Sequence, residues 1–241
     1  MPRVALFATC LVDQFFPDVA KAALKLLRRA GCDVDFPMDQ TCCGQPFFNM
    51  GHRDAAIPLA KRTIDLLRPY DAVVLPSGSC TTMIRVFYPE LLRDDPAWLR
   101  AAEEVGRKTY ELTEYLVTVL KRIDLGGTFD GKVTFHDCCH LLRELRVKDQ
   151  PRALLKATKG CDLAEMKDAA ECCGFGGTFS VKFGPVSGGI LDEKIACIKA
   201  SGAPVVAACD VSCLMHMAGG LSRQGVPVRA MHVAEIAASG L

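Results

Sequence analysis

Short runs of apolar, often β-branched residues alternate along this chain with longer segments whose apolar residues recur at helical spacing. The predicted strands are residues 4–8, 72–75, 133–137 and 205–208. The predicted helices are residues 19–29, 53–67, 150–158 and 191–201. Alternation of this kind predicts an α/β protein with parallel sheets, because a crossover helix is what carries the chain back to begin the next parallel strand.

The cysteines indicate that the chain consists of two similar halves. Each half contains a lone cysteine, an adjacent pair followed by glycine, and a further cysteine downstream. These residues are Cys10, Cys42, Cys43 and Cys80 in the first half and Cys139, Cys172, Cys173 and Cys213 in the second. The offsets between the halves are 129, 130 and 133 residues, so the two sets stay nearly in register. We infer an internal duplication.

The duplication also predicts how the chain is divided. A turn signal at Gly126-Gly127 separates the halves, and each half ends in a predicted helix, at residues 111–120 and 232–239. We therefore predict two domains, residues 1–127 and residues 128–241. Each is expected to be a small Rossmann-like unit with its own parallel sheet, and the two are expected to be related by a pseudo-two-fold axis.

The lone and the downstream cysteine of each half follow predicted strands within a few residues. In open α/β sheets, ligands bind beyond the carboxyl ends of the strands, so these cysteines should converge. Helix-like segments follow Cys80 and Cys213, and the partial positive charge of a helix N-terminus favours the thiolate form. Each half is therefore expected to gather its thiolates at one edge of its sheet.

The adjacent cysteines of each half cannot easily form a disulfide with each other, but both sulfurs can point toward one multinuclear centre. Gly44 and Gly174 let the backbone pass close to such a centre because they carry no Cβ. The predicted metal and cofactor ligands are Cys10, Cys42, Cys43, Cys80, Cys139, Cys172, Cys173 and Cys213. Cys209 and His140 are secondary candidates. His136 and His216 also lie near the cysteines and rank below His140, because a polar contact at a strand end explains them as well.

The remaining cysteines carry weaker predictions. Cys32, Cys161 and Cys197 have no counterpart in the duplicated pattern and are interpreted as packing residues. The pattern leaves the roles of Cys138 and Cys209 open. The total of 13 cysteines is odd, and the chain enters a strand-like run at once, so we expect a cytoplasmic protein without a disulfide framework.

Charge and hydropathy argue against a nucleic-acid-binding protein and against a membrane-spanning protein. The 29 Lys and Arg residues nearly balance the 28 Asp and Glu residues and form no basic block, so no nucleic-acid partner is expected. No apolar run approaches the ~20 residues of a membrane-spanning helix.

Four thiolates suit an iron–sulfur cluster or a tetrahedral zinc ion. Because the predicted ligands come from distant loops rather than close Cys-x-x-Cys pairs, iron–sulfur is favoured.

Five stretches carry a resemblance to a known family. They are residues 6–13, 40–46, 76–80, 136–143 and 172–180. Their lone Cys, Cys-Cys-Gly and downstream Cys resemble the CCG (cysteine-rich) domain family. That family includes the B subunit of heterodisulfide reductase, the iron–sulfur subunit of glycolate oxidase and a lactate-utilisation branch. The resemblance extends over essentially the full length of the chain.

The resemblance implies an iron–sulfur redox subunit, with a 4Fe–4S cluster, of a cytoplasmic system that oxidises L-lactate to pyruvate. Its implied partners are the other subunits of that system, LutB-like and LutC-like proteins. Some family members carry zinc in one of their two sites. The alternative function is therefore a zinc-binding scaffolding module of an oxidoreductase complex.

The chain departs from the family's downstream Cys-x-x-Cys in both halves. Met83 stands where the second cysteine would follow Cys80, and Cys209 lies one residue too far from Cys213. We therefore expect centres with four cysteine ligands rather than five.

Overall fold

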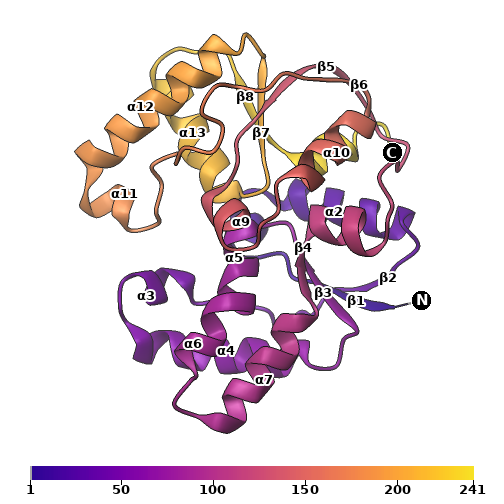
Figure 1. The fold of residues 1–241 in the computed structure, drawn as a ribbon, viewed down its shortest axis with the longest axis vertical. Coiled ribbons are helices and arrows are strands. Elements are labelled where there is room, and N and C mark those ends of the chain that lie inside the picture. The colour runs from indigo at the N-terminus through magenta and orange to yellow at the C-terminus, as the bar shows by residue number, and fades with distance from the viewer. Residues whose placement is uncertain (1) are drawn as a thin grey trace.

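The computed structural model describes residues 2–241, which form two four-stranded sheets (Figure 1). All strand pairs are parallel. The strand order is β2-β1-β3-β4 in the first sheet and β6-β5-β7-β8 in the second, so one topology occurs twice. The predicted α/β fold of duplicated units is confirmed. The division into domains at residues 127 and 128 stays a prediction.

The first sheet is formed by the N-terminal half of the chain. Its strands are β1 (Arg3–Leu6), β2 (Asp33–Asp35), β3 (Ala72–Leu75) and β4 (Thr109–Glu111). The helices of this half are α1 (Cys10–Phe15), α2 (Pro17–Arg29), α3 (Gln45–Asn49), α4 (Arg53–Leu67), α5 (Gly78–Thr82), α6 (Tyr88–Leu91), α7 (Pro96–Arg107) and α8 (Leu112–Glu114). Two π-helical segments, η1 (Met83–Phe87) and η2 (Tyr115–Val119), continue α5 and α8.

The second sheet repeats this arrangement. Its strands are β5 (Thr128–Phe135), β6 (Lys159–Leu163), β7 (Val205–Ala208) and β8 (Arg229–His232). Its helices are α9 (Cys139–Arg143), α10 (Asp149–Ala157), α11 (Phe179–Lys182), α12 (Gly184–Ala200), α13 (Val211–Arg223) and α14 (Val233–Ala237). Helix α12 begins well before the predicted start at residue 191. The first turns of α12 contain Gly188 and Gly189. Because glycine has low helix propensity, the sequence pattern did not predict a helix there.

The central strands β1 and β5 end in the same way. One residue beyond each strand, the N–H of Phe7 donates to the carbonyl of Val74 at 3.0 Å, and that of His136 donates to the carbonyl of Ala207 at 2.9 Å. Val74 and Ala207 lie at matching positions of β3 and β7. Phe7 and His136 are therefore structural equivalents in the two halves.

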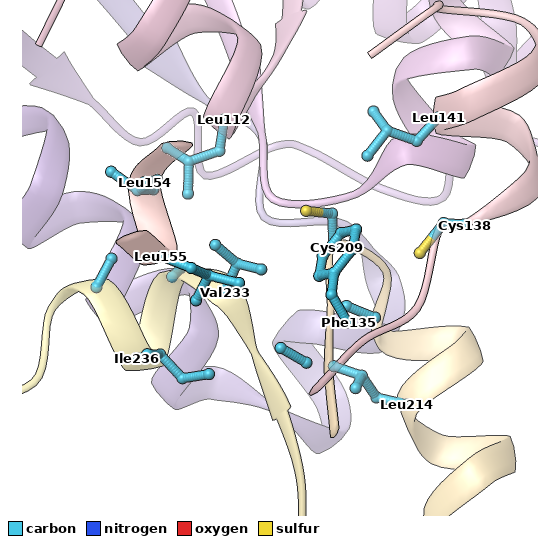
Figure 2. Close-up of a cluster of buried hydrophobic side chains, with 14 of the residues drawn as sticks. Leu112, Phe135, Cys138, Leu141, Leu154, Leu155, Cys209, Leu214, Val233 and Ile236 are labelled. Carbon is cyan, nitrogen blue, oxygen red and sulfur yellow. The ribbon is translucent and has the colours of Figure 1, made fainter. Parts of the chain in front are cut away.

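A shared hydrophobic core joins the halves. One buried cluster combines first-half residues such as Leu26 with second-half residues such as Phe135 and Ile236. Figure 2 shows part of this cluster. Helix α14 of the second half packs on α2 of the first. A separate cluster, which includes Ile64 and Tyr88, lies within the first half.

The halves also meet at the loops that follow β3 and β7. Ser77 caps α5 by accepting a hydrogen bond from the N–H of Cys80, and Asp210 caps α13 through the N–H of Ser212. The N–H of Gly78 donates to the carbonyl of Cys209 at 3.2 Å. These loops lead into the helices that carry the downstream cysteines, so the contact between the halves helps to place both cysteine sets.

Among the helices of residues 2–241, none combines the length and apolar character that crossing a membrane would require.

Candidate metal centres

The first cysteine set gathers at the C-terminal edge of the first sheet. Cys10 is the first residue of α1, Cys42 and Cys43 lie in the loop after β2, and Cys80 lies in the first turn of α5. The sulfurs of Cys43 and Cys80 are 3.4 Å apart, and the thiol of Cys42 lies close enough to those of Cys10 and Cys43 to shift its pKa. The four predicted residues therefore form one continuous group of sulfurs.

The second set has the same arrangement. Cys139 begins α9, Cys172 and Cys173 lie in the loop after β6, and Cys213 lies in the first turn of α13. The thiol of Cys172 contacts those of Cys139 and Cys173, and Cys173 in turn contacts Cys213. The structure thus brings the eight predicted cysteines together as two separate groups of four.

In each set, one thiol of the adjacent pair has strong thiolate character. Hydrogen bonds from Cys10 and Cys43 lower the pKa of Cys42 to about 3, and the N–H of Gly44 donates to its sulfur at 3.4 Å. In the second set, Cys139 and Cys173 lower the pKa of Cys172 to about 2. Because the thiolate is the metal-binding form of cysteine, each set presents at least one sulfur in the form that binds a cation.

The partners of these thiolates hold their protons more tightly. The hydrogen bond to Cys42 raises the pKa of Cys10, and the hydrogen bond to Cys172 raises that of Cys139. Burial adds to the effect in both cases. Several thiols crowded into a buried space cannot all ionise without a compensating positive charge, and a bound metal supplies that charge. The donor set therefore fits a metal or a metal cluster.

The glycine after each cysteine pair adopts a left-handed conformation, with φ of +85° at Gly44 and +91° at Gly174. A Cβ on Gly174 would lie 2.6 Å from the carbonyl oxygen of Ser187 in α12. The hydroxyl of Ser187 donates to the carbonyl of Gly174 at 2.7 Å and lies 3.3 Å from Nε2 of His216. The second Cys-Cys-Gly turn is therefore held tightly against α12.

The second set contains additional donors that the first set lacks. His136 is 1% exposed, and one of its ring nitrogens lies within 4.8 Å of the sulfurs of Cys173 and Cys213. The thiol of Cys138 is also buried and lies 4.0 Å from the carbonyl oxygen of His136. Sequence analysis left Cys138 open and ranked His140 above His136 as a candidate ligand. One sequence signal does point to His136: the register of the duplication places this polar residue where the first half has Phe7.

The secondary candidates lie in different surroundings. The thiol of Cys209 is close to Thr113 and Glu111 of the first half, and Figure 2 shows its sulfur directed toward Leu112 rather than toward Cys138. Nδ1 of His140 lies 3.7 Å from the sulfur of Cys139. His140 is therefore beside the second set, whereas Cys209 faces the contact between the halves.

Two cationic side chains bind the segments that precede Cys172 and Cys139. The ammonium of Lys194 is buried and donates to the carbonyl of Asp168 at 2.6 Å, and burial lowers its pKa. Arg152 makes a two-pronged ion pair with Asp137, at 2.7 and 2.9 Å, and also binds Glu165. Asp137 lies two residues before Cys139, so this ion pair helps to fix the segment that leads from β5 to that cysteine.

Comparison with known proteins agrees with this geometry. Residues 4–85 and 133–218 match the family described as the cysteine-rich domain, CCG. The chain is a member of the CCG family. The two matched ranges contain the two cysteine sets, one in each. This CCG protein is 46% identical to "Lactate utilization protein A" of Geobacillus kaustophilus, over 97% of its own length and 98% of the relative's. The protein of the same name from Bacillus subtilis is 47% identical over the same shares of the two chains.

Proposed function

We propose that this CCG protein is the iron–sulfur redox subunit of a cytoplasmic system that oxidises L-lactate to pyruvate. The observation that carries the proposal is the convergence of two groups of four cysteine sulfurs at the C-terminal edges of duplicated parallel sheets. Near-full-length similarity to proteins named for lactate utilisation supplies the metabolic context.

In this proposal each cysteine set holds one centre. The ligands of the first are Cys10, Cys42, Cys43 and Cys80, and those of the second are Cys139, Cys172, Cys173 and Cys213. When bound, an iron–sulfur cluster, in our proposal a 4Fe–4S cluster, would accept or donate single electrons. The protein supplies thiolates and restricts water, since Cys43, Cys80, Cys173 and Cys213 are buried. The proposed partners are LutB-like and LutC-like subunits, which would exchange electrons with this one.

One distance supports a second candidate function, a zinc-binding scaffolding module. The 3.4 Å between the sulfurs of Cys43 and Cys80 is near the separation of about 3.8 Å that two thiolates take around tetrahedral zinc with Zn–S bonds of about 2.3 Å. Zinc has no redox chemistry, so such a site would stabilise the fold without passing electrons. This candidate predicts zinc in place of iron and no reduction by dithionite.

The function is tested by complementation. A Bacillus subtilis strain that lacks its own lactate utilization protein A would receive the gene for this chain, for its Cys43→Ser/Cys173→Ser variant, or for its Cys32→Ser variant as a matched control. We expect growth on L-lactate with the wild type and with Cys32→Ser, and none with the double variant. Growth with the double variant at normal protein levels would contradict a metal-dependent role in lactate oxidation.

A further inference from the structure

We propose that His136 is a nitrogen ligand of the second centre, which makes the two centres of this protein chemically unequal. The first centre is then held by thiolates alone and the second by thiolates and an imidazole. This inference rests on the proposed metal-binding function, which it deepens.

The position of His136 is that of a ligand. The residue follows β5, while Cys173 comes from the loop after β6 and Cys213 from the first turn of α13. Three donor atoms from three separate elements lie within 4.8 Å of one another, and all three residues are buried. Imidazole nitrogen and thiolate sulfur are the donors that zinc and iron centres take in proteins.

His136 has no other evident use for its polar atoms. Within the part of the chain that the structure describes, neither ring nitrogen has a hydrogen-bond partner. Buried polar atoms are nearly always paired, because an unpaired one loses its hydration without compensation. A metal bound between His136 and the two cysteines would satisfy one of these nitrogens.

The other buried histidine shows what a structural role looks like in this fold. His232 is fully buried and its Nε2 has no partner among the described residues, but its Nδ1 accepts a hydrogen bond from the N–H of Ala234 at 3.0 Å and caps α14. His136 makes no such contact. Its equivalent in the first half is Phe7, so packing at this position accepts an apolar ring. The imidazole of His136 is therefore best explained by a ligand that the first half does not bind in this way.

His136 stands where the first half has Phe7, so its imidazole is an additional ligand and replaces no cysteine of the second set. The two centres then differ in the number and in the type of their ligands. A thiolate in place of this imidazole would lower the reduction potential of an iron–sulfur centre, because it adds a negative charge.

The test isolates the second centre. The full chain with Cys42→Ser/Cys43→Ser is purified anaerobically, and X-ray absorption is recorded at the K-edge of whichever metal elemental analysis finds. His136→Phe, which copies the first half, is compared with His140→Phe as the matched control. We expect imidazole scattering in the parent and in His140→Phe. In His136→Phe we expect it to disappear, with or without loss of metal.

The outcomes separate the inference from the proposed function. Metal that persists in the second site with no imidazole scattering, or with scattering that only His140→Phe removes, would overturn the role of His136 alone. A parent with an intact fold and no metal would overturn both claims. A second readout uses His136→Cys: if the centre is an iron–sulfur cluster, metal content should be kept while its reduction potential becomes more negative, and an unchanged potential would count against ligation.

Discussion

Ser77 and Asp210 occupy equivalent positions in the two halves and hydrogen-bond to each other, with the hydroxyl of Ser77 donating to Oδ2 of Asp210 at 3.1 Å. Each residue caps the helix that carries the downstream cysteine of its own half. Asp210 also accepts from the N–H of Ser79 at 2.8 Å. One buried carboxylate therefore helps to place Cys80 and Cys213 together.

Removal of this carboxylate should destabilise the protein. Asp210→Ala leaves the donors of Ser77, Ser79 and Ser212 without their acceptor, and we expect the free energy of unfolding to fall by about 3 kcal/mol. Urea denaturation measures the change. Asp192→Ala is the control, because Asp192 is exposed and its bond to Gln224 lies on the surface. Equal effects of the two substitutions would count against the role given to Asp210.

The two Cys-Cys-Gly turns should differ in their tolerance of a side chain. Gly44→Ala meets only ordinary contacts and should cost about 1–2 kcal/mol for its left-handed backbone. Gly174→Ala introduces the same backbone strain and also places its Cβ 2.6 Å from the carbonyl oxygen of Ser187. We therefore expect the free energy of unfolding to fall by about 3 kcal/mol or more. Thermal and urea denaturation of the matched pair provide the comparison. A smaller effect at Gly174 than at Gly44 would be inconsistent with the tight turn.

Glu111 predicts how stability depends on pH. Burial raises the pKa of this carboxyl from 4.5 to about 7, so between these values the folded protein holds a proton that the unfolded chain has released. The stabilisation is complete below the unfolded pKa and is lost as pH rises through about 7, and its size is roughly 3 kcal/mol. Glu111→Gln should remove this component from the free energy of unfolding measured between pH 5 and pH 8. Glu103→Gln, at an exposed site of α7, should leave the pH profile as in wild type.

The ion pair between Arg152 and Asp137 should matter more than the surface pairs. Arg152→Met leaves a carboxylate buried without its partner, and we expect a loss of about 3–5 kcal/mol in the free energy of unfolding. Asp137→Asn combined with Arg152→Met should recover part of that loss, since neither partner of the pair then leaves a buried charge behind. Arg143→Met, at an exposed position of α9, serves as the control. Full additivity of the two substitutions would argue against the pair.

Much of this structure could be predicted from local patterns. The duplicated sheets follow from alternating strand and helix signals, and the convergence of the cysteines follows from their positions after strands. The contact of Ser77 with Asp210 could not be predicted, because it depends on how the two halves pack. His136 could not be ranked above His140 for a similar reason: its burial beside Cys173 and Cys213 appears only when three distant segments fold together.

The central claim is that each cysteine set holds a metal centre of its own. Iron, sulfide and zinc would be measured in anaerobically purified wild type, Cys43→Ser, Cys173→Ser and the double variant, with Cys32→Ser as control. The account predicts that each single variant loses the metal of one set and keeps that of the other, that the double variant has none, and that the control matches wild type. Metal-free wild type, or a folded double variant with its metal intact, would contradict the account.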